Sequence, residues 1–129
     1  SIHLPELPAG VRVLLVEDND INAEIVADML VAQRVLCLRA PNGEVALQAV
    51  EKYAFDVILM DCQMPVMDGF EATRRIRMRG DAKKDTPIIA LTANAFAEDR
   101  EACLEAGMNA HLSKPIRKPT LIKMLAQFL

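Results

Sequence analysis

Polar side chains follow four of the short apolar runs in this sequence, and their types suit phosphate chemistry. Glu17 and Asp18 come after the first run, Asp61 after the third, Thr92 after the fourth and Lys114 after the fifth. If the runs are parallel strands, their carboxyl ends meet at one edge of a sheet and these side chains converge there. Three carboxylates in one pocket repel one another, which raises pKa values or requires a cation. A hard ion such as Mg²⁺ is therefore expected.

These residues also supply the parts for in-line transfer of a phosphoryl group to an aspartate. Ionised Asp61 would attack directly, without a general base. Lys114 can pair with a carboxylate at rest and with a phosphoryl oxygen later, and Thr92 adds a hydroxyl donor. These residues also have ordinary structural explanations. Thr92 could cap the end of a strand and Lys114 could be a solvated turn residue. The acids at 17–20 could serve the start of a helix, with Asp20 as its N-cap. A carboxylate at Asp61, directly after an apolar strand, is costly without partners and favours the functional interpretation.

Two other functions use a similar set of residues. A hydrolase that forms an aspartyl phosphate needs a second carboxylate two residues after the nucleophile, and that position is Gln63. A flavodoxin-like binder of FMN needs a phosphate loop rich in Ser, Thr and Gly after the first strand, whereas residues 17–20 are Glu-Asp-Asn-Asp. Both alternatives are therefore disfavoured.

The elements that must position this site alternate along the chain. Five apolar runs without polar alternation predict strands buried on both faces, at Val11–Val16, Val35–Ala40, Val57–Met60, Pro87–Leu91 and Ala110–Ser113. Stretches of helical period follow each run. Five such units predict a three-layer α/β/α sandwich around a five-stranded parallel sheet. The second run ends in Arg39-Ala40-Pro41-Asn42-Gly43, which is typical turn sequence, and no chemistry is expected from it.

Composition limits the class of protein. The chain has 129 residues, 52% of them hydrophobic, which fits one domain with a full core. Residues 1–10 are expected to be a linker and residues 11–129 the domain. Three cysteines are an odd number without metal-ligand spacing, so a reducing cytoplasm is expected. No apolar run is long enough to enter a membrane, and a net charge of -3 argues against nucleic-acid binding.

Taken together, these motifs resemble those of a known family. The chain resembles the receiver domain of two-component response regulators over residues 11–129, through Glu17-Asp18, Asp61 with Met64-Pro65 and Met67-Asp68-Gly69, Thr92-Ala93 and Lys114-Pro115. The resemblance implies the flavodoxin-like strand order 2-1-3-4-5, for which a member of this family is a standard example.

The resemblance also implies a role for each matching residue. Asp61 would be the phosphoacceptor, Asp18 a direct Mg²⁺ ligand, Glu17 a ligand through water, and the carbonyl of Gln63 a further ligand. Lys114 would hold the phosphoryl group. The implied peptide between Lys114 and Pro115 is cis.

Further positions would act after phosphorylation. Thr92 would bond a phosphoryl oxygen and move inward. Gln63 and Asn94 would set the rate at which water removes the phosphoryl group. His111 stands where the family usually has Tyr or Phe, so the switch residue would be an imidazole whose response depends on pH. Glu17 replaces the commoner Asp, which could alter the ion preference.

The wider motif sequences look most like receivers attached to hybrid sensor histidine kinases. The implied donor is the phosphohistidine domain of a kinase, and the implied acceptor is a histidine phosphotransfer domain. A stand-alone single-domain response regulator is the alternative. The resemblance is also compatible with a weak homodimer and with a longer parent protein anchored in the inner membrane.

Overall fold

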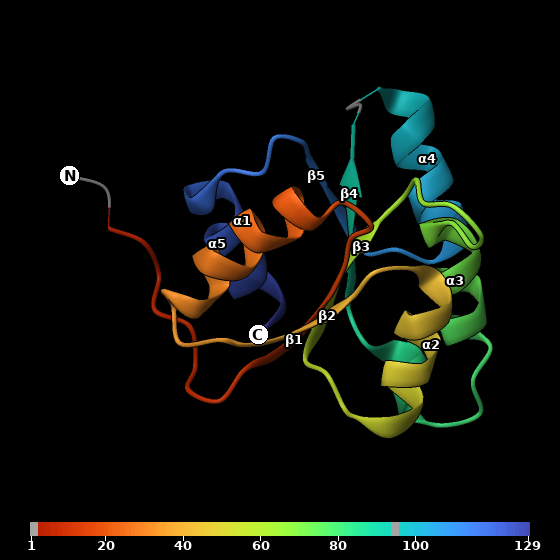
Figure 1. Cartoon of the computed structure of the whole chain (residues 1–129), viewed down its shortest axis with the longest axis horizontal. Coiled ribbons are helices and arrows are strands. Elements are labelled where there is room, and N and C mark those ends of the chain that lie inside the picture. Colours follow the sequence, from red (N-terminus) through yellow and green to blue (C-terminus); the bar gives the residue numbers. More distant parts are fainter. Residues whose placement is uncertain (1–2, 94–95) are drawn as a thin grey trace.

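A computed structural model describes residues 3–93 and 96–129. Within these residues, five strands and five α-helices alternate, with one short 3₁₀ helix: β1 Arg12–Val16, α1 Asp20–Val31, β2 Leu36–Ala40, α2 Gly43–Lys52, β3 Val57–Asp61, α3 Gly69–Arg77, η1 Ala82–Asp85, β4 Ile88–Thr92, α4 Ala97–Ala106, β5 Ala110–Ser113 and α5 Lys118–Phe128. Figure 1 shows how the strands and α-helices are arranged. All neighbouring strands are parallel, in the order β2-β1-β3-β4-β5. The predicted fold class and strand order are confirmed.

The sheet is the middle of three layers. Helices α1 and α5 cover one face, and α2, α3 and α4 cover the other (Figure 1). On the first side, Leu15 of β1 packs in one cluster with Leu30 of α1 and Leu121 of α5. On the second side, Leu14 of β1 shares a cluster with Ile76 of α3. Because successive side chains of a strand point to opposite faces, unbroken apolar runs fill both cores at once.

Helix starts are fixed by side chains that accept backbone hydrogen bonds. Asn19 caps α1 by accepting from the Asn22 amide at 2.9 Å, and Asp68 caps α3 by accepting from the Glu71 amide at 2.9 Å. The expectation that Asp20 caps α1 is therefore wrong. Asn19 alone has the extended backbone that the N-cap requires, and Asp20 is already the first helical residue.

The strand register brings the functional loops to one edge. Val16 of β1 lies opposite Met60 of β3, so Glu17 and Asp61 follow at the same level. The strands β3 and β4 each extend one residue further than the sequence predicts, so Asp61 and Thr92 are the last residues of their strands. Their backbones are thus held by the sheet while their side chains lie at its carboxyl edge.

Candidate functional site: an acidic cavity at the carboxyl edge of the sheet

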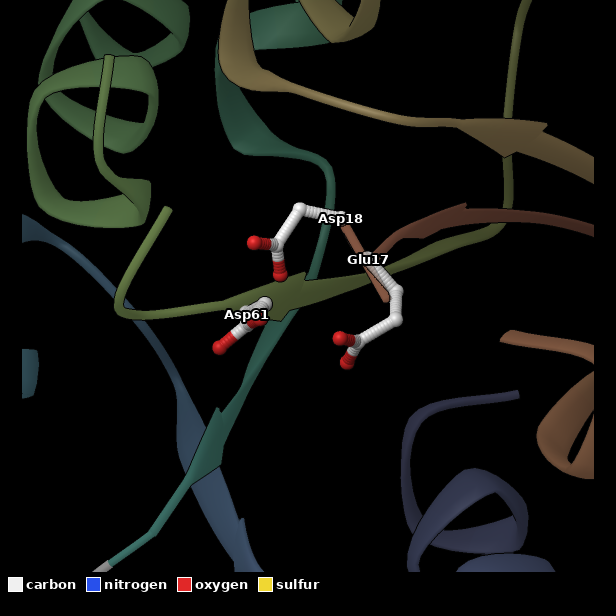
Figure 2. Close-up of side chains that lie close together, drawn as sticks. All are labelled: Glu17, Asp18 and Asp61. Atoms are coloured by element: carbon white, nitrogen blue, oxygen red, sulfur yellow. The ribbon is translucent and has the colours of Figure 1, made fainter. Parts of the chain in front are cut away.

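Three carboxylates meet where β1 and β3 end. Glu17, Asp18 and Asp61 each offer an oxygen, and these oxygens lie within 4.8 Å of one another. Figure 2 shows the three carboxylates facing a common space. Glu17 is 2% exposed and Asp61 3%, whereas Asp18 lies at the surface. The structure therefore brings together the three acids that the sequence singles out.

Lys114 connects two of these acids. Its Nζ lies 3.1 Å from Oε2 of Glu17 and 3.2 Å from Oδ2 of Asp61. The lysine follows β5, and the peptide that joins it to Pro115 is cis, as the resemblance implies. One ammonium group thus balances part of the charge of three carboxylates.

The surroundings of Asp61 raise its pKa, chiefly through burial. Burial and the nearby charge of Glu17 raise it from 3.8 to about 7, although Lys114 and the Gln63 amide act in the opposite direction. Burial lowers the pKa of Lys114, but hydrogen bonding and charge from Glu17 and Asp61 outweigh this and raise it. Three carboxyl groups outnumber the one ammonium group, and the carboxylate oxygens are the ligand type that Mg²⁺ prefers. The residues present fit a hard divalent cation.

The acids line a cavity of about 270 Å³ that also reaches Gln63, Thr92 and residues of α4. The backbone amide of Gln63 donates to Oδ1 of Asp61 at 3.2 Å. Thr92 is 5% exposed and its carbonyl accepts from the Lys114 amide at 2.7 Å. Of the eight predicted site residues, six line this cavity. His111 is half-buried on the edge strand β5 and lines a different hollow, and Asn94 lies outside the described residues.

Gly69 is required by close packing. A Cβ on this residue would collide with the backbone carbonyl oxygen of Asp61. The Gly69 amide also donates to the carbonyl of Cys62 at 3.1 Å. The start of α3 thus packs directly against the backbone of Asp61, the candidate phosphoacceptor. The Asp-Gly pair at 68–69 marks this position in the sequence, but the contact itself depends on the fold.

Two further features of the site could not be predicted from the sequence. The thiols of Cys62 and Cys103 are buried with their Sγ atoms 3.8 Å apart beside the cavity, so α4 packs against the end of β3. Arg39, at the end of β2 where no chemistry was expected, donates to the backbone carbonyl of Glu17. Sequence spacing could not reveal either, because both contacts join different strands or layers.

Comparison with known proteins identifies the family. The response regulator receiver domain model matches residues 13–126. The chain belongs to this family. The receiver domain is 43% identical over 129 residues to hybrid signal transduction histidine kinase B of Dictyostelium discoideum, covering 92% of this chain and 7% of that protein. It therefore spans less than a tenth of the length of that relative.

Solved structures agree with this assignment. The receiver domain of sensor histidine kinase PA1611 from Pseudomonas aeruginosa, with a magnesium ion coordinated in its active-site cleft, is 43% identical with a TM-score of 0.86, over 93% of this chain and 98% of that one. The receiver domain of Ssk1 from Saccharomyces cerevisiae, crystallised with the histidine phosphotransfer protein Ypd1, is 30% identical with a TM-score of 0.85, over 93% and 89%. This receiver domain thus resembles those of hybrid kinases and phosphorelays, and the stand-alone alternative is not favoured.

Proposed function

We propose that Asp61 is the phosphoacceptor of this receiver domain and takes a phosphoryl group from a phosphohistidine in a Mg²⁺-dependent step. The observation that carries the proposal is the shared cavity of Asp61, Glu17, Asp18 and Lys114, in which a buried carboxylate faces two acids and one ammonium group. The magnesium ion in the PA1611 receiver structure supports the choice of metal.

The step forms one bond and breaks one. An ionised carboxylate oxygen of Asp61 attacks the phosphorus, and the P–N bond to the donor imidazole breaks with its electron pair left on nitrogen. Lys114 exchanges its contact with Asp61 for a phosphoryl oxygen, while the Thr92 hydroxyl donates to another. These fixed donors hold the charge that develops on the transferred group.

The metal would be held by the carboxylates of Asp18 and Asp61, by the backbone carbonyl of Gln63 and, through water, by Glu17. When bound, Mg²⁺ supplies positive charge that neutralises the phosphoryl oxygens and lowers the repulsion against an anionic nucleophile. The same charge favours the ionised form of Asp61, whose pKa otherwise lies near 7. Gln63 and Asn94 would tune hydrolysis of the phosphoryl group, and His111 would respond to the movement of Thr92.

A surface next to the cavity suits the docking of a helical partner. Ile21 and Ile25 of α1 are 70% and 48% exposed. Ile25 lines an apolar hollow that shares Glu17 and Lys114 with the acidic cavity. A partner helix seated there could carry its histidine to Asp61. We infer that the partners are a kinase phosphohistidine domain and a histidine phosphotransfer domain, which the Ypd1–Ssk1 complex supports.

The hydrolase alternative gains no support from the cavity. Gln63 contributes an amide side chain where that reaction needs a carboxylic acid, and its backbone amide already donates to Asp61. Transfer to the protein itself is the chemistry that the residues favour.

The proposal is tested by incubating the domain with a small phosphodonor such as acetyl phosphate, with and without Mg²⁺, and measuring the intact mass. We expect one phosphoryl group on the wild type in Mg²⁺ and none in Asp61→Asn or after chelation. Asp68→Asn, which retains the side-chain acceptor that caps α3, is the matched control and is expected to be phosphorylated. An unchanged wild-type mass, or an equal gain in Asp61→Asn, rejects the proposal.

A further inference from the structure

Arg39 reaches from the end of β2 to the loop that carries two of the metal-binding acids. It pairs with Leu15 in the sheet, and its side chain is 30% exposed. Its Nη2 and Nε donate to the backbone carbonyl oxygen of Glu17 at 2.8 and 3.1 Å. Its Nη1 donates to Oδ1 of Asp20 at 2.6 Å. One guanidinium therefore holds the loop at residues 17 and 20, on both sides of Asp18.

We propose that Arg39 is a positioning residue for the metal site, which fixes the loop so that Glu17 and Asp18 present their carboxylates to the ion. The inference rests on the proposed magnesium-dependent function. A peptide unit is planar, so fixing the Glu17 carbonyl oxygen also fixes the amide nitrogen of Asp18. The contact therefore sets the positions of the Asp18 amide nitrogen and Cα, from which the side chain of Asp18 projects.

The geometry requires the fork of an arginine. Two N–H groups of one guanidinium reach the same oxygen while a third reaches Asp20, and the planar group supplies these directions without adjustment. A lysine ammonium could reproduce the charge but not the fork. The other contacts of Glu17 act on its amide and its carboxylate. The amide donates to the Ala40 carbonyl at 3.1 Å, Oε1 accepts from the Asn19 amide at 3.2 Å, and Oε2 pairs with Lys114. Among the residues that the structure describes, Arg39 is the one whose side chain bonds the carbonyl of the peptide between Glu17 and Asp18.

A positioning role and a purely electrostatic role predict opposite changes in Mg²⁺ affinity when Arg39 is removed. A positive charge beside the acids repels Mg²⁺, so by Coulomb's law alone its removal should strengthen metal binding. If Arg39 positions the ligands, its removal should weaken binding even though a repulsive charge has gone. Arg39→Lys separates the two further, because it keeps the charge and removes the fork.

The test is Mg²⁺ affinity measured by isothermal titration calorimetry on the wild type, Arg39→Gln, Arg39→Lys and Asp20→Asn. We expect the dissociation constant to rise about tenfold in both Arg39 variants, as is typical when a group that orients a ligand is removed. Asp20→Asn, which removes the ion pair but keeps the bonds to Glu17, should remain within about twofold of the wild type. Far-UV circular dichroism confirms that each variant is folded.

A second readout separates positioning from a general structural role. The rate of phosphorylation by acetyl phosphate should recover to the wild-type value at saturating Mg²⁺ in Arg39→Lys, with only the half-saturating concentration raised. Unchanged or tighter Mg²⁺ binding in both Arg39 variants, or an affinity in Arg39→Lys equal to the wild type, overturns the inference. Failure of the wild type itself to bind Mg²⁺ would instead reject the proposed function, so the two failures are distinguishable.

Discussion

Replacing Asp61 by Asn should make the metal-free protein more stable at neutral pH. The pKa of Asp61 is raised in the folded state, from 3.8 to about 7, chiefly by burial and then by Glu17. A raised pKa means that the folded protein binds the proton more tightly than the unfolded chain. The contribution of this group to stability is therefore fully present below about pH 4 and is lost as the pH rises to about 7.

The size of the effect follows from the two pKa values. At about 1.4 kcal/mol for each pH unit between them, ionisation of Asp61 costs the folded state about 4 kcal/mol above pH 7. Asn removes this charge but also removes a partner of Lys114, which lies 3.2 Å away. We expect a net gain of about 2 kcal/mol, which in a domain of this size raises Tm by roughly 8 °C.

The assay is thermal unfolding followed by circular dichroism in EDTA, at about pH 7.5 and about pH 4, a pair of conditions that spans the titration. The Asn variant should be more stable at the higher pH, and the difference should shrink at the lower pH. Mg²⁺ should stabilise the wild type and close the gap. Asp68→Asn is the surface control and should change stability by less than about 0.5 kcal/mol. An Asn variant that is less stable than the wild type in EDTA at neutral pH would refute the reasoning.

Four further predictions follow from the same cavity. Gly69→Ala should lower the free energy of unfolding by about 2 kcal/mol in a urea titration, because the new methyl group must displace the Asp61 backbone; an unchanged midpoint contradicts the packing. Lys114→Met should slow phosphorylation about 100-fold at saturating Mg²⁺, yet bind Mg²⁺ more tightly by calorimetry because a competing cation is gone. Mg²⁺ affinity should fall about tenfold per pH unit below pH 7, where Asp61 takes up a proton, and stay level above it; a flat profile from pH 5 to 7 contradicts the raised pKa of Asp61. Cys62 and Cys103, which are buried and whose thiol pKa values are raised by burial, should react with a thiol reagent only after unfolding.

The fold could be predicted from the sequence because its strongest signals are local. Five apolar runs without alternation mark strands covered on both faces, and the observed strands agree with the predicted bounds to within one residue at each end. The strand order itself came from the family resemblance. The misassigned cap of α1 shows the limit of local signals, since Asn19 and Asp20 are both good capping residues and only the backbone angles decide between them.

The acids of the site could also be predicted, because each directly follows an apolar strand. The residues that contact these acids from other strands and helices could not be predicted from the sequence. The bonds of Arg39 to Glu17 depend on the parallel register of β1 with β2 and on the reach of one long side chain. The clash that excludes a side chain at Gly69 depends on how α3 packs on the end of β3. That His111 fills the family's aromatic position is readable from the sequence, whereas its place in a separate hollow beside Thr120 and Met124 of α5 depends on the fold.

Chemical trapping of the phosphorylated residue tests the central claim most directly. The domain is phosphorylated with acetyl phosphate in Mg²⁺, treated with borohydride, which converts an aspartyl phosphate to homoserine, and digested for mass spectrometry. Homoserine at position 61, and at no other Asp or Glu, is the expected result. Homoserine at Asp18 or elsewhere with Asp61 unchanged would contradict the assignment of this cavity as the phosphoacceptor site.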